Sequence, residues 1–235
     1  MNTDPNPASP TTRSYRYYDL VMVGFVTVYL CSNLIGPAKA AEVYGFTFGA
    51  GVLFFPLSYV FGDILTEVYG YARARKVIWA GFAAMLFAAL MATVVVALPP
   101  ASGWQNQAAY EIVYGQTPRI VFASIIAYCC GEFVNSYVLA KMKVADAGRR
   151  MGFRFVASTI VGEGVDSLLF YPIAFYGLWS NDLLLKVMAA QWCLKVAVEL
   201  CFLPLTVRIV NALKRAESED FFDRKTNFTP FSLKT

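Results

Sequence analysis

The sequence predicts an all-α fold, a polytopic membrane bundle of six transmembrane helices. Apolar residues make up 57% of the 235-residue chain and charged residues only 15%, whereas soluble domains are about one quarter charged. The apolar residues fall in runs close to the roughly 20 residues that a helix needs to cross a bilayer. Backbone polar groups inside lipid must be satisfied within the protein, so we expect these runs to be helices.

Six spans are expected, separated by glycine- and proline-containing breaks. The third is the clearest, because Val77 to Leu98 contains no charged residue. Residues 1–16 are polar and read as a disordered cytoplasmic tail without the order of a signal peptide, and residues 212–235 read as a cytoplasmic C-terminal tail. The transport domain covers residues 17–211, with spans at 17–37, 46–69, 76–98, 117–140, 154–177 and 183–211.

Basic residues mark alternate ends of the spans and predict that both termini are cytoplasmic, because loops rich in Lys and Arg stay inside. The net charge of +4 therefore reflects topology in a plasma membrane and not a nucleic-acid partner. These residues are Arg13, Arg16, Arg73, Arg75, Lys76, Lys141, Lys143, Arg149, Arg150, Arg154, Arg208, Lys214 and Arg215.

The residue inventory excludes several kinds of chemistry. The chain has no histidine and five cysteines, all within apolar runs, so no metal-ligand spacing and no disulfide framework is predicted. The sequence has no Gly-x4-Gly-Lys-Ser/Thr loop for ATP. We expect no cofactor. A membrane enzyme that uses carboxylates is the remaining catalytic alternative, although no nucleophile with a base partner is visible.

Polar side chains lie inside the expected spans, where an ionisable group at mid-bilayer costs about 2.5–3.5 kcal/mol. Helical spacing places the members of each group on one face. A helix bundle does not need a polar interior in order to fold. A transported solute with several hydrogen-bonding edges needs such an interior for binding. The groups are Asp63 and Glu67; Glu132 and Asn135; Glu163 and Asp166; Gln191, Lys195 and Glu199; and the lone amide Asn33.

Two of these groups also have a structural interpretation through nearby cations. Lys195 and Glu199 are four residues apart on one helix and can neutralise each other. Asp63 and Glu67 precede the basic residues 73–76 and can join an ion network at the cytoplasmic end.

The other groups lack a cation on their own helix. Glu163 and Asp166 therefore need a partner on another helix, a wet cavity or a proton. Asn33 and Asn135 fit interhelical hydrogen bonding as well as they fit contact with a ligand.

Spans one to three resemble spans four to six at two points. Asn33 to Lys39 and Asn135 to Lys141 both read Asn, five residues, Lys, with Ala before the Lys. A carboxylate pair follows in the next span of each half. Units of three spans would be inverted in the membrane, which is a recurring plan of transporters that hold the solute between the halves.

Residues 54–71 read Phe-Phe-Pro-Leu-Ser-Tyr-Val-Phe-Gly-Asp-Ile-Leu-Thr-Glu-Val-Tyr-Gly-Tyr and resemble the signature of the bacterial queuosine precursor transporter family. Residues 32–36, 133–143, 158–167 and 227–231 extend the resemblance over nearly the whole membrane region. It implies uptake across the bacterial inner membrane of the 7-deazaguanines preQ0 and preQ1, which feed the queuosine modification of tRNA. The protein itself would not contact tRNA.

A guanine-like substrate suits these polar groups, because its N–H groups can donate to carboxylates and its carbonyl can accept from an amide. A flat ring can also stack on aromatic side chains. The predicted substrate-binding residues are Asn33, Glu132, Asn135, Glu163, Asp166 and Gln191; the predicted gating or coupling residues are Asp63, Glu67, Lys195 and Glu199; the stacking candidates are Phe61, Tyr128, Tyr137 and Tyr171.

The mode of transport and the assembly stay open at this point. The substrate-binding membrane subunit of an energy-coupled vitamin uptake complex is the nearest alternative to a transporter that works alone. Ala80, Ala84, Ala88 and Ala92 form a small-residue stripe that fits packing within the chain, a homo-oligomer or such a partner. A buried carboxylate could carry a coupled proton, or transport could be facilitated diffusion.

Overall fold

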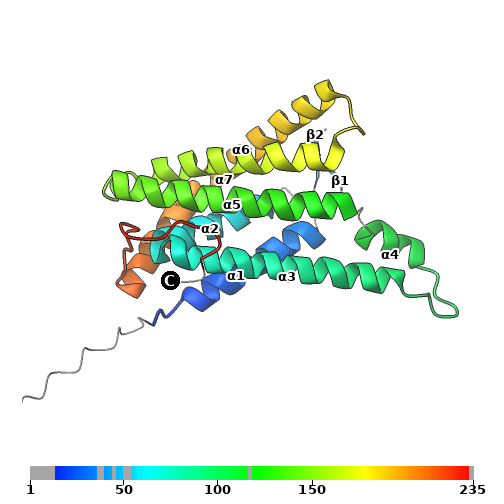
Figure 1. Cartoon of the computed structure of the whole chain (residues 1–235), viewed down its shortest axis with the longest axis horizontal. Helices are drawn as coiled ribbons and strands as arrows, with labels where there is room; N and C mark the ends of the chain where they lie inside the picture. The colour runs from blue at the N-terminus through cyan, green and yellow to red at the C-terminus, as the bar shows by residue number, and fades with distance from the viewer. Residues whose placement is uncertain (1–13, 36–39, 44–45, 50–53, 116–117, 233–235) are drawn as a thin grey trace, which may run out of the picture.

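The computed structural model describes residues 14–35, 40–43, 46–49, 54–115 and 118–232 of the chain, and long helices dominate it (Figure 1). Helices α5 and α6 lie side by side, and α3 runs along the opposite side of the bundle. The elements are α1 Tyr18–Leu34, β1 Ala40–Val43, β2 Phe46–Gly49, α2 Phe55–Tyr69, α3 Tyr71–Ala97, α4 Gln107–Tyr114, α5 Pro118–Ala145, α6 Met151–Phe175 and α7 Asn181–Glu217.

The all-α class is confirmed, with one short pair of strands between α1 and α2 that the sequence analysis did not expect. Strands β1 and β2 pair antiparallel there, and β2 occupies residues that the sequence analysis gave to the second span. Aromatic and β-branched residues next to glycine favour a strand over a helix. Helix α2 begins only at Phe55, with Pro56 in its first turn, where proline is tolerated.

Several other helices extend beyond the expected spans, although α6 ends at Phe175, two residues before the expected limit. Helix α3 begins at Tyr71, α5 continues to Ala145 and α7 to Glu217, each beyond the expected limit. The expected limits fall near the first basic residues, where a span leaves the hydrocarbon. Backbone hydrogen bonding does not depend on that boundary, so the helices continue past it. The short helix α4 was not expected in the loop between the third and fourth spans.

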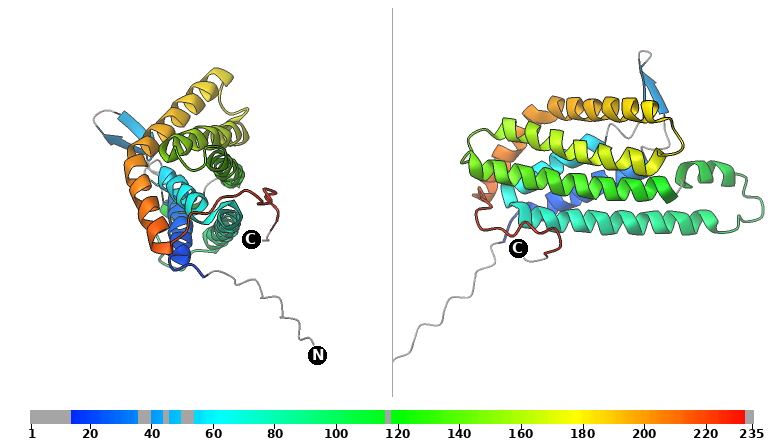
Figure 2. Two further views of the ribbon diagram at one scale, coloured as in Figure 1. Left: turned by 90° about the vertical axis from the view of Figure 1, so that its left-hand side faces the viewer. Right: turned by 45° about the horizontal axis from the view of Figure 1, so that its top comes forward.

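Residues 218–232, the C-terminal segment, return along α3 and pack against it (Figure 2). Both carboxylate oxygens of Asp223 accept from the backbone N–H of Tyr71, at 3.1 and 3.2 Å. Nη1 of Arg75 donates to the carbonyl of Asn227 at 2.7 Å. The expected tail from residue 212 is therefore partly helix α7 and partly this packed segment, while residues 1–13 of the expected N-terminal tail lie outside the described residues.

The surface of α3 indicates contact with lipid. Phe87 is 64% exposed, Leu90 54% and Val94 53%, and such a continuous apolar face is unusual on a soluble protein. By length and apolar composition, α3 and the stretch Gln107–Ala145 are long enough to cross a bilayer, whereas α1 is a shorter apolar helix. The chain is a helical membrane protein.

Candidate functional site

Polar side chains from α2, α5, α6 and α7 meet in the interior of the bundle. We call Asp63, Glu132, Glu163, Asp166 and Lys195 the carboxylate cluster. The four acidic residues are at most 3% exposed, although they come from three different helices. The structure thus brings together residues that the sequence could place only on separate helix faces.

Lys195 on α7 is the cation of this cluster. Its Nζ lies 2.5 Å from Oδ2 of Asp166 and 3.2 Å from Oε2 of Glu163, and 3.8 Å from the ring centroid of Phe55, a cation–π geometry. The expected pairing of Lys195 with Glu199 is wrong, because two carboxylates of α6 face the ammonium. The partner that Glu163 and Asp166 required is therefore on α7.

Glycines let α5 and α6 approach closely enough to form the cluster. A β-carbon on Gly131 would lie 2.9 Å from the carbonyl oxygen of Gly162, and one on Gly162 would lie 3.0 Å from the carbonyl oxygen of Gly131. Both distances are too short for any other residue, so backbone meets backbone here. Glu132 and Glu163 each follow one of these glycines, and the contact brings the two carboxylates into one region.

Two of the contacts between α2 and α5 lie in the carboxylate cluster. A β-carbon on Gly62 would lie only 1.6 Å from Oε1 of Glu132. The carboxyl group of Glu132 therefore packs directly against the backbone of α2. Neither oxygen of Glu132 has a hydrogen-bond partner among the described residues. On the next residue of α2, Oδ1 of Asp63 accepts from Nδ2 of Asn135 at 2.9 Å.

Aromatic side chains form a wall that continues from Phe55, beside Lys195. Tyr29 and Tyr128 stack with centroids 4.0 Å apart and an interplanar angle of 17°. Tyr59 and Phe55 meet Tyr128 edge-on, at 5.7 and 5.6 Å. The hydroxyl groups of Tyr29 and Tyr59 are buried without a hydrogen-bond partner among the described residues. We call these four residues the aromatic wall.

Only Tyr128 of the aromatic wall was named from the sequence. Tyr59 lies four residues before Asp63 on one helix face, and this spacing is the signal that could have found it. Two other stacking candidates pack elsewhere: Tyr137 contacts Phe228 of the C-terminal segment, with centroids 5.3 Å apart, and the ring of Phe61 lies where a side chain on Gly24 of α1 would stand. The fourth, Tyr171, is buried on α6, near enough to Lys195 to interact electrostatically.

Asn33 and Gln191 lie outside the cluster. Oδ1 of Asn33 accepts from Oγ of Ser124 at 2.6 Å, which links α1 to α5. Asn33 also borders an apolar cleft of about 830 Å³ between α1, α3, α4 and α5. Gln191 is partly exposed on α7 and has no polar contact within the described ranges. Their roles in binding stay predictions.

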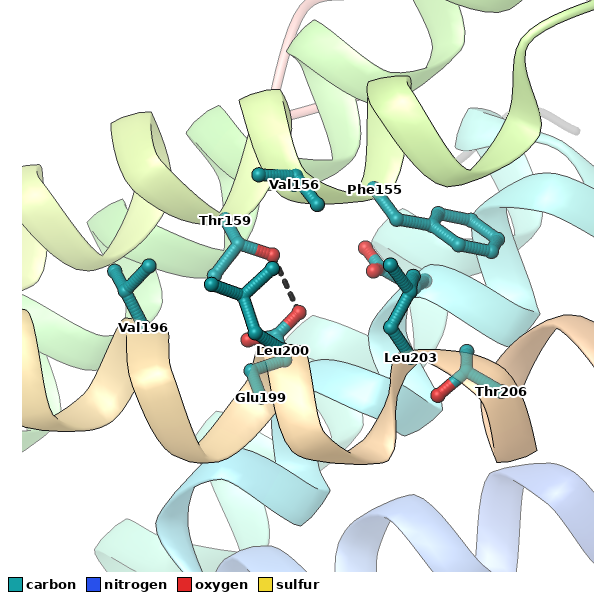
Figure 3. Close-up of a pocket in the computed structure, with 9 residues that line it drawn as sticks. Phe155, Val156, Thr159, Val196, Glu199, Leu200, Leu203 and Thr206 are labelled. Carbon is teal, nitrogen blue, oxygen red and sulfur yellow. Dashed lines mark hydrogen bonds between the residues drawn. The ribbon is translucent and has the colours of Figure 1, made fainter.

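Glu199 borders a much smaller cavity between α6 and α7 (Figure 3). The hydroxyl of Thr159 donates to its Oε1, and its Oε2 has no hydrogen-bond partner among the described residues. Asp63 lines the same cavity. This cavity, whose lining is mostly apolar, therefore adjoins the carboxylate cluster through Asp63.

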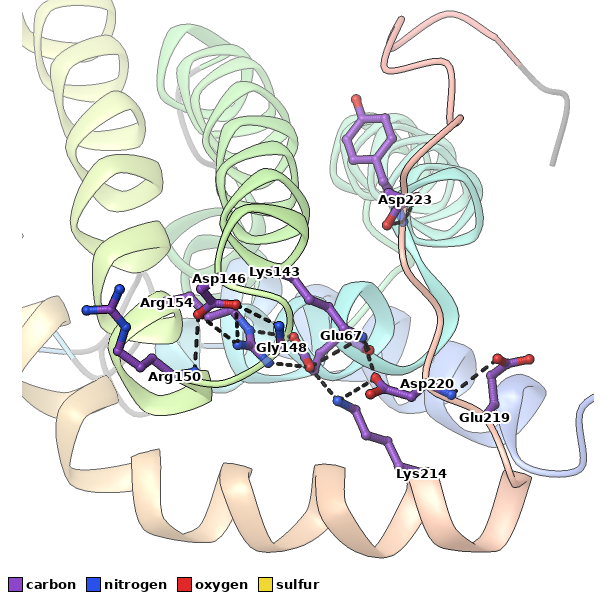
Figure 4. A network of polar contacts seen from close by, with 11 residues as sticks. Glu67, Lys143, Asp146, Gly148, Arg150, Arg154, Lys214, Glu219, Asp220 and Asp223 are labelled. Atoms are coloured by element: carbon purple, nitrogen blue, oxygen red, sulfur yellow. Dashed lines mark hydrogen bonds and ion pairs between the residues drawn. The ribbon is translucent and has the colours of Figure 1, made fainter.

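Glu67, one turn after Asp63, belongs to a separate ion network (Figure 4). Arg154 donates to both of its carboxylate oxygens, at 2.7 and 2.9 Å, and Nζ of Lys214 lies 2.5 Å from Oε1. Nζ of Lys143 lies 3.4 Å from the same oxygen. The expectation of an ion network is confirmed for Glu67, but its cations come from α5, α6 and α7 and not from residues 73–76.

Two further carboxylates complete this network. Asp220 of the C-terminal segment lies 2.6 Å from Nζ of Lys143 and 2.7 Å from Nζ of Lys214, and Asp146 lies 3.3 Å from Arg154. Burial alone would raise the pKa of Asp220, but the hydrogen bonds from Lys143 and Lys214 outweigh it and hold the pKa below its usual range. We call these six residues the Glu67 network: Glu67, Lys143, Asp146, Arg154, Lys214 and Asp220.

Comparisons with known proteins agree on one family. Residues 49–209, which contain the whole carboxylate cluster, match the family described as Putative vitamin uptake transporter. The chain is 31% identical over 185 residues to a probable queuosine precursor transporter of Bacillus subtilis (strain 168), covering 78% of this chain and 80% of that protein. It is 27% identical over 176 residues to the queuosine precursor transporter of Escherichia coli (strain K12), covering 73% and 77%. No solved structure matches the chain.

Proposed function

Because the chain belongs to the Putative vitamin uptake transporter family, we propose that it is a membrane transporter that imports queuosine precursors, as the names of its relatives indicate. The observation that carries this proposal is a buried carboxylate cluster beside an aromatic wall inside an apolar bundle. Buried ionisable groups in a membrane protein commonly mark the path of a solute.

The chemistry of 7-deazaguanines such as preQ0 and preQ1 suits this region. Their N–H and amino groups are donors in one plane, and a carboxylate can accept two of them. Glu163 and Asp166 provide acceptors, and Oε1 of Glu163 has no hydrogen-bond partner among the described residues. The flat bicyclic ring can stack on Tyr59 or Tyr128 of the aromatic wall.

The position of Lys195 supports the choice of a substrate rich in donors. Its ammonium lies between two carboxylates and over an aromatic face, as the aminomethyl group of preQ1 would. Two carboxylates facing one ammonium leave acceptor capacity for a second donor. Lys195 therefore keeps Glu163 and Asp166 in place in the empty protein and shares them with the substrate in the loaded one.

We extend the proposal to the arrangement in the membrane. The six long helices cross the bacterial inner membrane with both termini in the cytoplasm, which the basic loops support. The Glu67 network then lies at the cytoplasmic end and closes the path below the carboxylate cluster. Helices α1–α3 and α5–α7 are the two inverted halves, and the contact of Asp63 with Asn135 joins them at the site.

Uptake of labelled preQ0 and preQ1 tests the proposal, both in cells and in liposomes that contain only the purified chain. We expect Glu163→Gln and Asp166→Asn each to lower uptake about 10- to 100-fold, the equivalent of one charge-assisted hydrogen bond. Glu111→Gln, on the exposed helix α4, is the matched control and should transport like wild type.

Insertion of every variant is verified by its amount in purified membranes. Unchanged uptake in both cluster variants would refute the assignment of the site. Uptake in cells but not in liposomes would favour the alternative, a binding subunit that needs a partner for energy.

A further inference from the structure

Glu132 is the acidic residue of the carboxylate cluster that the described structure leaves without any partner. Its side chain is 0% exposed, and neither carboxyl oxygen accepts a hydrogen bond. The missing side chain of Gly62 is what makes room for the carboxyl group against α2. An ionised carboxylate in such a place, without donor or cation, costs several kcal/mol.

The groups that face Glu132 from the surrounding helices are mostly acidic and add to this cost, because like charges disfavour ionisation. The ammonium of Lys195 is already engaged by Asp166 and Glu163. The neighbouring groups are the carboxyls of Asp63, Glu163, Asp166 and Glu199, the phenols of Tyr29 and Tyr59, and, from α5 itself, the phenol of Tyr128 and the thiol of Cys129.

The other carboxyls each have a group that supports their charge. Asp63 accepts from Asn135, Glu199 accepts from Thr159, and the two carboxyls of α6 share Lys195. Glu132 alone among these five has no donor. A metal ion does not take this role in the described residues, because no three acidic, cysteine or histidine side chains are placed to hold one.

We propose that Glu132 is the proton-binding site that couples import of the substrate to a proton gradient. This inference rests on the proposed transport function. In the closed, substrate-loaded arrangement Glu132 is neutral, which allows it to pack on the backbone of Gly62. When α2 moves away from α5 on the cytoplasmic side, water reaches the carboxyl group and accepts its proton, and on the outer side hydronium returns a proton to the same oxygen.

The geometry links this proton to the movement of the halves. Gly62 and Asp63 are consecutive on α2, and both touch α5, the first through Glu132 and the second through Asn135. Any separation of α2 from α5 therefore exposes Glu132 and breaks the hydrogen bond of Asp63 together. An ionised Glu132 resists closure around the substrate, because its charge would lose hydration water at the backbone of Gly62, so the substrate enters only together with a proton. In the empty site water takes the place of the substrate, and the halves return with Glu132 ionised and hydrated.

The full-length chain in liposomes tests the inference with preQ0, which is neutral, while valinomycin and potassium clamp the membrane potential. We expect wild-type protein to accumulate preQ0 about tenfold per pH unit of inward proton gradient, the ratio for one coupled proton. In Glu132→Gln the ratio of uptake with and without the gradient should fall to about one, and Glu111→Gln should keep the wild-type ratio.

Two measurements do not require transport by a variant. Adding preQ0 to wild-type liposomes should acidify the lumen, as a trapped pH-sensitive dye reports. Infrared spectra of the protein saturated with preQ0 at neutral pH should show a carboxylic acid carbonyl band that Glu132→Gln removes.

Three results would overturn the coupling role: a gradient response that persists in Glu132→Gln, wild-type uptake that ignores the proton gradient or follows sodium instead, or an infrared spectrum that the substitution leaves unchanged. A wild-type protein that shows the band but moves no preQ0 under any gradient would refute the transport function itself.

Discussion

The Glu67 network and the carboxylate cluster both bury ionisable side chains of α2, one helical turn apart, but they balance charge in opposite ways. In the network three carboxylates meet three cations, and Arg154 binds Glu67 with two hydrogen bonds. In the cluster four carboxyls meet Lys195 alone, and oxygens of Glu132 and Glu163 have no hydrogen-bond partner among the described residues.

This difference in charge balance distinguishes a region that stabilises the folded protein from a region whose buried acceptors are left open for a proton or a solute. In the network every carboxylate is paired with a cation, and Asp220 connects the C-terminal segment to the helices through Lys143 and Lys214. Such an arrangement stabilises the fold. Unsatisfied buried acceptors cost stability, and a protein gains from them only where a proton or a solute completes them. Substitutions in the two regions should therefore change the free energy of unfolding by different amounts.

The largest effect is expected from breaking the Glu67 network. Arg154→Ala removes both hydrogen bonds to Glu67 and leaves that carboxylate buried with only lysine partners. We expect the free energy of unfolding to fall by about 3–5 kcal/mol, the usual cost of removing one partner of a buried ion pair. Denaturant unfolding of the purified protein in detergent measures it.

Arg149→Ala is the control for this change, because Arg149 is exposed in the loop just before α6 and its removal should cost less than about 0.5 kcal/mol. Glu132→Gln is the contrast from the cluster: an amide replaces a neutral carboxyl group of the same shape, and stability should change as little as in the control. A cost for Arg154→Ala no larger than for Arg149→Ala would remove the distinction between the two regions.

An intermediate effect is expected inside the cluster, from the pair of Lys195 with Asp166. A double-mutant cycle with Lys195→Met and Asp166→Asn should give a coupling energy of about 1–3 kcal/mol in unfolding, as for buried residues in direct contact. The exposed pair of Lys186 with Asp182, 2.7 Å apart on α7, serves as the reference. The same cycle there should give about 0.3–0.5 kcal/mol, and equal couplings would show that the cluster pair is solvated.

The smallest effect is a pH dependence of the network. The pKa of Asp220 is lower in the folded protein than its ordinary value, so its stabilising contribution is complete above the ordinary value, about 3.9. It is lost as the pH falls below that value and through the lowered one. Asp220→Asn should therefore be less stable than wild type at pH 6, by less than about 1 kcal/mol for a half-exposed group.

The difference between Asp220→Asn and wild type should close as the pH falls below about 3.9, which thermal unfolding at a series of pH values measures. Glu111→Gln controls for acid effects elsewhere on the surface. A gap that stays constant through this range would show that Asp220 is not held by Lys143 and Lys214.

Much of the fold was readable from the sequence because lipid imposes simple rules on composition. Apolar runs fixed where helices lie, and polar residues inside them marked Asp63, Glu132, Glu163 and Asp166 as exceptional. Strand β2, Phe46–Gly49, escaped this reasoning, since an apolar run of short length fits a strand or a helix equally well.

The partners of the polar residues were not readable in the same way. Spacing along one helix suggested that Lys195 pairs with Glu199, but α6 presents two better placed carboxylates once the helices pack. Likewise Glu67 forms ion pairs with Arg154 and Lys214, which are distant in the sequence, and not with the basic residues that come next in the chain.

The sequence by itself therefore determined that this is a helical membrane protein with ionisable groups in its interior, because composition and periodicity act locally along the chain. The tertiary structure alone decided which of these groups are neutralised and which are left without a partner. Hydrogen bonds and ion pairs form only when their atoms lie within about 3–4 Å of each other, and such distances between helices depend on packing contacts such as that of Gly131 with Gly162. The Glu67 network and the carboxylate cluster can therefore be told apart only in the assembled bundle, and not in the six expected spans.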